Sequence, residues 1–547
     1  MARNNDEYLM KRAIARLLSS ANTVRQATGL LIVSALASNI LGLIRNTIIA
    51  RNIPLGLQDN FWSAFLLPDF IFNVLIFGAI SSAFIPLFRG LLVEKKETDA
   101  WKLAGSFFGQ LTALTAALSV GLLVAMPWLI HNIFPRLAEA DAGSVTTLAR
   151  WLLVQTLLFC WSYLAGGILN AKKRFTAYAL SPLLYNISII VGAIFAPRFG
   201  DRAIDALIIS VIIGALLHLL IQIPSVIKVG FKLRYISLKG TSYSREALLL
   251  MAPRSISLGI LSLNGLVMAA IARALMEPGA LSIFRLVEAF QTAPIAIFAN
   301  AVAVALFPSL TEYAAKQDWP SYAQALEKAF RFILFTMIPA TILFIMLRAQ
   351  IIRLYIGLGQ EIDWNETIRA IELFGWFAIG MVPAGLVSIL ARAFYAFKNT
   401  WLPLIAAGVS LLFGAATAFA LAANTNLDVS VLGIAATAAS LVQFMLLYIA
   451  YLRLAKKPLN EAPILSTGWR TTLIGLGMAA VVWLSLRAVD GIYTSLALPG
   501  LNTHYVIGLL LQAGFAVIMG GIFFWLAARI LLPEEWNWVR QYRRNRR

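Results

Sequence analysis

The chain has 547 residues, of which 60% are hydrophobic and only 13% are charged. A soluble domain has about 45–50% apolar and about 25% charged residues. A mean hydropathy of +0.79 therefore excludes a water-soluble globule of this length, whose surface would need more charge. The single cysteine excludes a disulfide scaffold. The composition is that of an integral membrane protein.

Apolar runs long enough to cross a bilayer as helices recur along the whole chain. A spanning helix needs about 20 mostly apolar residues, and the first residues contain no apolar core of signal-peptide type. We predict an all-α membrane protein with fourteen transmembrane helices. The fourteen runs cover residues 28–50, 61–88, 104–130, 146–168, 177–196, 204–227, 246–273, 280–308, 325–349, 368–391, 401–423, 430–452, 468–488 and 504–531.

Basic residues are concentrated in alternate connecting segments. If the N-terminus is cytoplasmic, the inner segments hold 32 of the 45 Lys and Arg residues. Because Lys and Arg are enriched in cytoplasmic loops, both termini are expected in the cytoplasm. The net charge of +19 is thereby explained by membrane orientation, and no nucleic-acid partner is expected.

Short motifs recur 221 or 222 residues apart, at matching ends of predicted spans. The three pairs are Ile48–Arg51 with Ala270–Arg273, Phe84–Pro86 with Leu306–Pro308, and Leu180–Pro182 with Trp401–Pro403. An offset of six spans preserves orientation, so the repeat is parallel. This pattern is typical of transporters whose two lobes are related by an axis along the membrane normal.

The repeat predicts how the chain is divided. The predicted parts are a cytoplasmic segment (1–27), an N-lobe (28–230), a C-lobe (231–455), a further pair of spans (456–532) and a basic cytoplasmic tail (533–547). The two lobes are predicted to form two pseudo-symmetric six-helix bundles. The last pair of spans falls outside the repeat, which indicates a separate role.

Few charged residues lie in or beside the predicted spans. A charge near the bilayer centre costs several kcal/mol, so such residues usually face a cavity or a partner. Those from the first two spans of each lobe suggest a shared cavity between the lobes. The charged candidates are Arg45, Asp59, Asp69, Arg254, Arg285 and Glu288. The polar residues Asn39 and Asn46, which lie near Arg45 in the sequence, are added to them.

Most of these candidates also have a purely structural interpretation. Arg285 and Glu288 are three residues apart on one helical face and can neutralise each other. Asp59 can cap a helix, and Arg254 can extend its guanidinium to the membrane surface. Arg45 has the weakest structural alternative, because it lies too deep to reach water unless a cavity comes to it.

Catalytic and metal-binding patterns are missing from the sequence. It has no Walker A motif, and its three His residues and one Cys are scattered rather than at metal-ligand spacing. No catalytic triad stands in a loop large enough to hold an active site. Neither an enzyme nor a cofactor nor a metal site is expected.

Several short motifs stand at the ends of the predicted spans, at residues 41–45, 50–51, 59, 64–68, 78–86, 167–171, 174–175, 182, 394–396 and 403. They resemble motifs of the lipid II flippases of the MurJ/MviN family, in the multidrug/oligosaccharidyl-lipid/polysaccharide exporter superfamily. The resemblance implies a carrier in the bacterial inner membrane that moves undecaprenyl-diphosphate-linked disaccharide-pentapeptide, lipid II, between leaflets by alternating access. It also implies that the last two helices form a groove for the lipid tail. We expect a monomer whose partners are this glycolipid and membrane lipids.

The family's charge pattern is matched only in part. Arg45, Asp59 and Ser282 match an arginine, an acidic residue and a serine of the pattern, whereas Arg254 and Arg285 have no counterpart in it. Charged positions of the pattern are occupied here by Asn39, Asn46, Phe72, Phe77 and Ala289. We therefore hypothesise that positive charge has moved from the first two spans to the seventh and eighth.

Other functions are compatible with the same sequence. A carrier of another polyprenyl-linked oligosaccharide would show the same altered charges, and a non-transporting pseudo-flippase scaffold would have lost its cavity arginines. A drug exporter of the superfamily is disfavoured, because those carriers take cations and favour acidic cavities.

Overall fold

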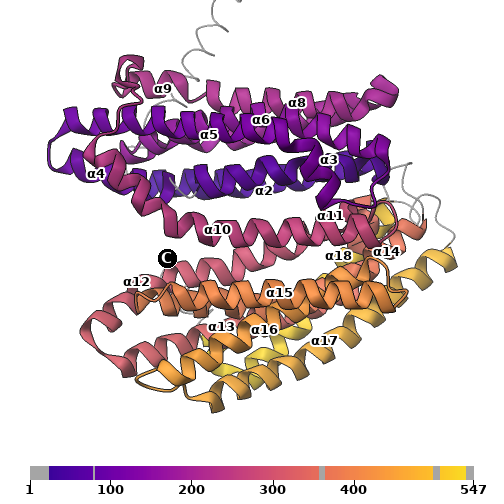
Figure 1. Cartoon of the computed structure of the whole chain (residues 1–547). Coiled ribbons are helices and arrows are strands. Elements are labelled where there is room, and N and C mark those ends of the chain that lie inside the picture. Colours follow the sequence, from indigo (N-terminus) through magenta and orange to yellow (C-terminus); the bar gives the residue numbers. More distant parts are fainter. Residues whose placement is uncertain (1–23, 78–79, 357–363, 497–505, 538–547) are drawn as a thin grey trace, which may run out of the picture. The chain divides into compact units, whose positions relative to one another are not determined.

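The computed structural model describes residues 24–77, 80–356, 364–496 and 506–537, and all its regular elements in these ranges are helices (Figure 1). The predicted all-α fold is confirmed. The chain divides into two compact units, one ending at Ala274 and the other beginning at Leu275. This division leaves the predicted lobe boundaries as predictions.

The first unit consists of long helices joined by short turns. Its α-helices are α2 (Val24–Asn52), α3 (Leu55–Ile71), α4 (Ile85–Val93), α5 (Glu97–Ile133), α6 (Glu139–Ala171), α7 (Phe175–Phe195), α8 (Ala203–Leu220), α9 (Ile223–Lys228) and α10 (Ser242–Leu275). Two π-helical segments, η1 (Phe72–Phe77) and η2 (Ile80–Phe84), lie between α3 and α4, and η3 (Ala196–Arg202) and η4 (Leu233–Tyr235) are 3₁₀ turns.

Apolar contacts hold this unit together. Helix α2 packs against α7, α7 against α8, and α6 against α3, α5 and α8. Phe84 stacks on Phe88 and Phe107 with ring centroids 5.3 and 5.4 Å apart, and all three are fully buried. The central α6 therefore carries residues that face several neighbours at once.

The second unit also consists of helices joined by turns. It contains α11 (Ala280–Pro294), the π-helical η5 (Ile295–Asn300), α12 (Ala301–Lys316), α13 (Trp319–Ile356), α14 (Trp364–Ala396), α15 (Trp401–Asn424), α16 (Ser430–Leu454), α17 (Glu461–Leu496) and α18 (Val506–Leu531). In its core the buried Tyr322 hydroxyl donates to the carbonyl of Ala393 at 2.8 Å.

Backbone geometry confirms the internal repeat. Lys95 and Gln317, 222 residues apart, both adopt left-handed conformations with φ of 60° and 58°. Each ends a helix in the same way, since Lys96 N donates to Leu91 O and Asp318 N to Tyr313 O at 2.9 Å. Such bonds satisfy carbonyls that a helix end would leave unpaired.

The π-helical segments follow the same symmetry. Segment η1 of the first unit and η5 of the second both lie in the middle of the second predicted span of a lobe. π-helical turns are rare and are frequent at functional sites. Because they recur at equivalent positions, the π-helical turns belong to the repeated structure itself and are not a local feature of one segment.

Twelve helices of the described residues are long and apolar enough to cross a membrane. One of these segments, Phe175–Lys228, has 54 residues and contains both α7 and α8, which were predicted as two spans. The second predicted span, 61–88, falls on α3, η1, η2 and α4 and includes residues 78–79, which lie outside the described residues. The count of fourteen stays a prediction.

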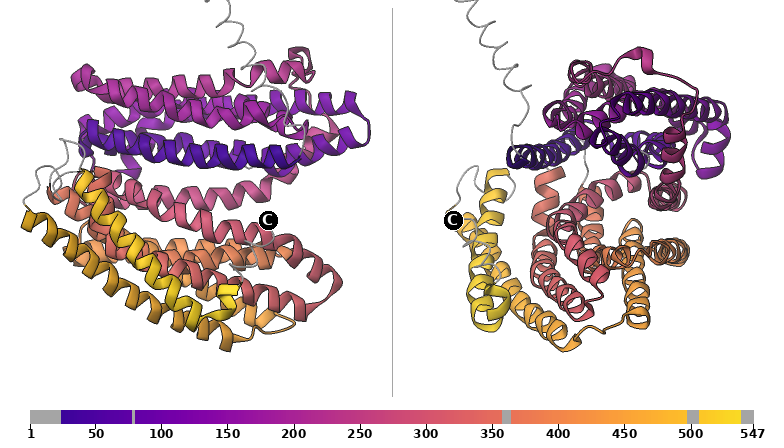
Figure 2. Two further views of the ribbon diagram at one scale, coloured as in Figure 1. Left: turned by 180° about the vertical axis from the view of Figure 1, so that it is seen from behind. Right: turned by 90° about the vertical axis from the view of Figure 1, so that its left-hand side faces the viewer.

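Helices α17 and α18 pack against each other and against α13 (Figure 2). Arg331 of α13 contacts Glu535, just after α18, at 2.6 Å, and Thr467 of α17 donates to the same carboxylate at 2.5 Å. Burial alone would raise the pKa of Glu535. Hydrogen bonds from Thr467 and Arg331 have the larger effect together, so the pKa of Glu535 lies below its ordinary value. The ionised carboxylate thus ties the additional pair of helices to the second unit.

Gly105 offers a test of the fold of the first unit. A Cβ on Gly105 of α5 would lie 1.8 Å from the carbonyl oxygen of Tyr235, so helix and loop would have to separate. We expect Gly105→Ala to lower the free energy of unfolding by about 1–3 kcal/mol, as overpacking does. Thermal unfolding of the detergent-purified protein measures this.

The matched control is Gly121→Ala on the same helix, where nothing lies within 4 Å of the added Cβ. This change raises helix propensity by up to about 1 kcal/mol, so it should not destabilise the protein. Equal melting temperatures for both variants would contradict the close approach of the loop to α5.

Candidate functional site

Arg45 lies on α2 inside the first unit, where neutral amides hold it. Its Nε donates to the side-chain oxygen of Asn46 at 3.0 Å, and its Nη1 to that of Asn186 on α7 at 3.1 Å. Asn186 is buried and is fixed in turn by donating to Ser38 Oγ and Pro182 O. The two amides orient the guanidinium but do not neutralise its charge.

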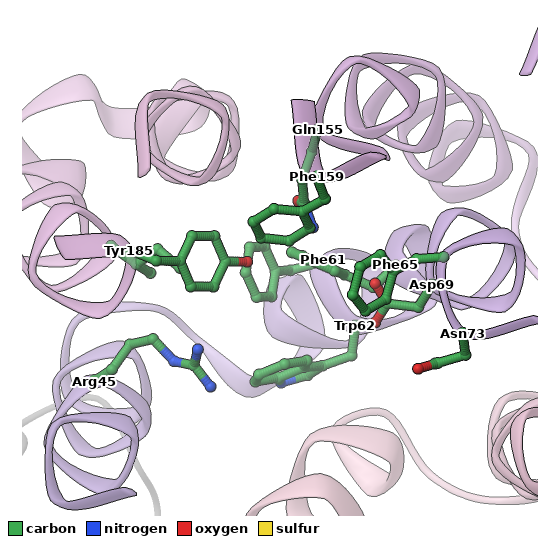
Figure 3. Close-up of a pocket in the computed structure, with 11 residues that line it drawn as sticks. Arg45, Phe61, Trp62, Phe65, Asp69, Asn73, Gln155, Phe159 and Tyr185 are labelled. Carbon is green, nitrogen blue, oxygen red and sulfur yellow. The ribbon is translucent and has the colours of Figure 1, made fainter. Parts of the chain in front are cut away.

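The Arg45 guanidinium lines a cavity of about 230 Å³ within this unit (Figure 3). Helices α2, α3, α6 and α7 and segment η1 supply its lining: Arg45, Phe61, Trp62, Phe65, Asp69, Phe72, Asn73, Gln155, Phe159, Tyr185 and Ile189. We call this cavity the N-unit pocket. Two of the predicted site residues, Arg45 and Asp69, therefore line the same pocket.

The polar groups of the N-unit pocket are separated along its length. Figure 3 shows the Arg45 guanidinium at one end and Asp69 and Asn73 at the other, with Trp62 between them. An acid at the far end would repel an anion bound there. The arrangement favours an anion at the Arg45 end and hydrogen-bond donors of a ligand at the Asp69 end.

Aromatic rings form much of the remaining wall. Phe61 packs on Phe65 with ring centroids 4.9 Å apart, and Phe159 packs on Tyr185 at 5.2 Å and on Phe72 at 5.4 Å. Edge-to-face contacts are among the arrangements that aromatic pairs favour. Phe72, which stands where the family pattern has a charged residue, is part of this wall.

Gln155 of α6 is a pocket residue that the sequence analysis missed. It is only 3% exposed, and its Oε1 has no hydrogen-bond partner among the residues that the structure describes. A buried acceptor without a partner costs about 1–3 kcal/mol. Because Gln155 lies in an apolar run with no charged neighbour, only its position against the pocket reveals it.

Asp59 lies elsewhere in the unit, in a buried ion pair. It is 1% exposed and accepts from Arg273, at the end of α10, at 3.1 Å. Arg273 also donates to Asn60 at 2.7 Å, and Asn60 donates to Asp141 at the start of α6 at 2.7 Å. Since α3 begins at Leu55 after Pro54, the prediction that Asp59 caps this helix is wrong.

The remaining predicted residues are distributed over both units. Asn46 orients Arg45, whereas Asn39 is exposed on α2, and the side chain of Arg254 lies outside the described residues. In the second unit Arg285 pairs with Glu288 at 3.0 Å, as its structural interpretation predicts, and Ser282 is buried in the first turn of α11.

The shared cavity between the lobes stays a prediction. Among the described residues, no group of three or more His, Cys, Asp or Glu side chains is placed to hold a metal ion.

Comparisons with known proteins identify the family. The family model of the lipid II flippase MurJ matches residues 56–500. The probable lipid II flippase MurJ of Rhizobium meliloti (strain 1021) is 26% identical over 395 residues, covering 71% of this chain and 73% of that protein. The corresponding protein of Bdellovibrio bacteriovorus is 24% identical and covers 88% of this chain and 91% of its own length.

Solved structures show the same fold. A lipid II flippase MurJ in an inward closed conformation has a TM-score of 0.73 at 22% identity, covering 92% of this chain and 99% of that one. An inward-facing multidrug resistance MATE family transporter of the MOP superfamily has a TM-score of 0.65 at 13% identity, covering 76% and 93%.

The long apolar helices and these structures define a polytopic membrane protein with a fold that it shares with a lipid II flippase and a MATE family transporter. The family match covers well over half of the chain. This protein belongs to the lipid II flippase MurJ family, which confirms the resemblance noted in the sequence and makes it a multi-pass protein of the inner membrane.

The Asp59–Arg273 ion pair gives a testable prediction of stability. Removing one partner of a buried pair costs about 3–5 kcal/mol because the other charge is left uncompensated. Asp59→Ala should therefore lower the melting temperature sharply, whereas the double variant with Arg273→Met should recover part of that loss.

Lys102→Ala, which breaks the exposed pair with Asp99, serves as the control and should leave the melting temperature unchanged, since surface ion pairs contribute little. A double variant no more stable than Asp59→Ala alone would argue against the pair as the source of the effect.

Proposed function

We propose that this protein moves lipid II from the inner to the outer leaflet of the bacterial cytoplasmic membrane by alternating access. The observation that carries the proposal is the Arg45 guanidinium, which faces a pocket within the membrane-spanning helices while neutral amides hold it. Membership of the lipid II flippase MurJ family supports this substrate.

The chemistry of the headgroup explains why such an arginine is needed. A diphosphate loses its hydration when it enters a membrane-embedded pocket, and charge-assisted hydrogen bonds must replace the lost water. Arginine suits this because its planar group binds phosphate oxygens in a bidentate manner. Asn46 and Asn186 use only part of its N–H donors, so further donors remain for the substrate.

Further predicted residues are proposed to complete the site. Arg254 and Asp69 of the first unit and Arg285, Ser282 and Glu288 of the second would contact the substrate, and α17 with α18 would guide the lipid tail. The protein would work as a monomer with both termini in the cytoplasm, among the lipids of the bilayer. With no nucleotide-binding motif in the sequence, the membrane potential is a proposed energy source, worth about 2.3 kcal/mol per charge per 100 mV.

Replacing Arg45 tests the proposed function. In a strain depleted of its own flippase, Arg45→Ala should lose transport by about tenfold or more, because a hydrogen bond to a charged group is worth about 1.5–3 kcal/mol. Transport is measured as lipid II exposed to an externally added enzyme that cleaves it. Arg45→Lys should recover part of the activity, since it keeps the charge but not the bidentate contact.

Arg150→Ala is the matched control, because Arg150 does not line the N-unit pocket and, among the described residues, donates a hydrogen bond to the backbone oxygen of Leu123. It should transport at the wild-type rate, and all variants should reach the membrane in equal amounts. Normal transport by Arg45→Ala would overturn the proposal, and failure of the wild type to transport would indicate a different glycan or a scaffold function.

A further inference from the structure

The N-unit pocket has an aromatic and polar part beside the Arg45 guanidinium. We propose that its part formed by Trp62, Phe65, Gln155 and Tyr185 binds a single pyranose ring of the headgroup, the sugar that carries the diphosphate. This inference rests on the proposed function and adds to it the part of the substrate that the first unit recognises.

The size of the pocket limits what it can hold. Sites for drug-sized ligands measure about 300–1,000 Å³, whereas this cavity measures about 230 Å³. A disaccharide with a pentapeptide is far larger than that. The pocket is suited to one ring next to a phosphate group, so the rest of the headgroup must lie outside it.

The walls match the two kinds of surface that a pyranose ring presents. Its C–H faces are apolar and pack on flat aromatic rings, and its rim carries hydroxyl groups. The Trp62 indole lies beside the space between Arg45 and Asn73 (Figure 3), and Trp62 and Phe65 are half-buried, so that part of each ring is accessible. Aromatic side chains of this kind supply large contact areas at little entropic cost.

The unpartnered Gln155 acceptor is the second observation that points to a ligand. Its Oε1 is buried against the pocket and accepts no hydrogen bond from the described residues. A hydroxyl group of the sugar, or the N–H of an acetamido substituent, would donate to it. The Tyr185 hydroxyl points into the same space (Figure 3) and can donate or accept.

The positions of the charged residues fix the orientation of the ring. With the diphosphate at the Arg45 end, the sugar attached to it extends toward Asp69 and Asn73, whose oxygens accept from hydroxyl groups. The reverse orientation would place the phosphate charge against Asp69. The pocket therefore distinguishes a sugar-bearing diphosphate from the diphosphate alone.

Binding measurements on the purified full-length protein test this assignment. The probes are lipid II, undecaprenyl diphosphate, which lacks the sugar, and undecaprenyl phosphate. We expect Trp62→Ala to raise the Kd for lipid II about tenfold and to leave the Kd for undecaprenyl diphosphate within about twofold, since truncation of a central aromatic contact costs affinity on that scale. Gln155→Leu should have the same selective effect, and Arg45→Ala should weaken binding of both diphosphates.

Trp128→Ala is the matched control, because the Trp128 side chain on α5 is 66% exposed and lies outside the pocket. It should change neither Kd. Thermal unfolding shows whether each variant is folded. If the Trp62→Ala variant does not fold, the Kd values of Gln155→Leu alone decide the outcome.

The outcomes separate the two proposals. If Trp62→Ala and Gln155→Leu bind lipid II as the wild type does, or lose both diphosphates equally, the sugar site is wrong while the flippase function stands. If the wild type binds lipid II no more tightly than undecaprenyl phosphate, the proposed function itself is wrong.

Discussion

The site depends on a cation that is held inside membrane-spanning helices without being neutralised. A charge in hydrocarbon is costly, and proteins usually pair it with a carboxylate. Here Arg45 donates to Asn46 and Asn186 instead. Amide oxygens offset part of the cost of desolvation, but they leave the net charge in place. An aspartate at position 46 would form an ion pair with Arg45 and weaken its attraction for a diphosphate.

Other arginines show the contrasting arrangement. Arg273 is paired with Asp59, Arg331 with Glu535, and both carboxylates are almost completely buried. These pairs join helices that are far apart in sequence, and their charges are already satisfied. The protein thus uses the same side chain in two ways: Arg273 and Arg331 have carboxylate partners and join helices, whereas Arg45 has amide partners and lines a pocket.

Features that depend on the local pattern of residues, such as the membrane helices, could be predicted from the sequence. Contacts between residues far apart in the sequence could not, because they depend on which faces of the helices meet. Hydropathy located the long apolar helices, and recurring motifs indicated a repeat with which the paired turns at Lys95 and Gln317 agree. Arg45 stood out because a charge in an apolar run is rare. Asn186 is 141 residues away from Arg45, and nothing near it in sequence signals that contact. In the sequence Gln155 looks like any other polar residue, and only the packing of α6 with α3 and α7 shows that it lines the pocket.

The aromatic wall bears on how a carrier releases its cargo. A flippase must bind the headgroup on one side and let it go on the other, so tight binding by several arginines would slow release. Within the N-unit pocket a single cation acts at one end, and the rings around Trp62 and Phe72 contribute contacts that need no charge. Apolar contact is short-ranged and is lost as soon as the walls separate, whereas the attraction between ions extends over several ångströms. A pocket with one cation and an aromatic wall is thus suited to a ligand that must be both bound and released.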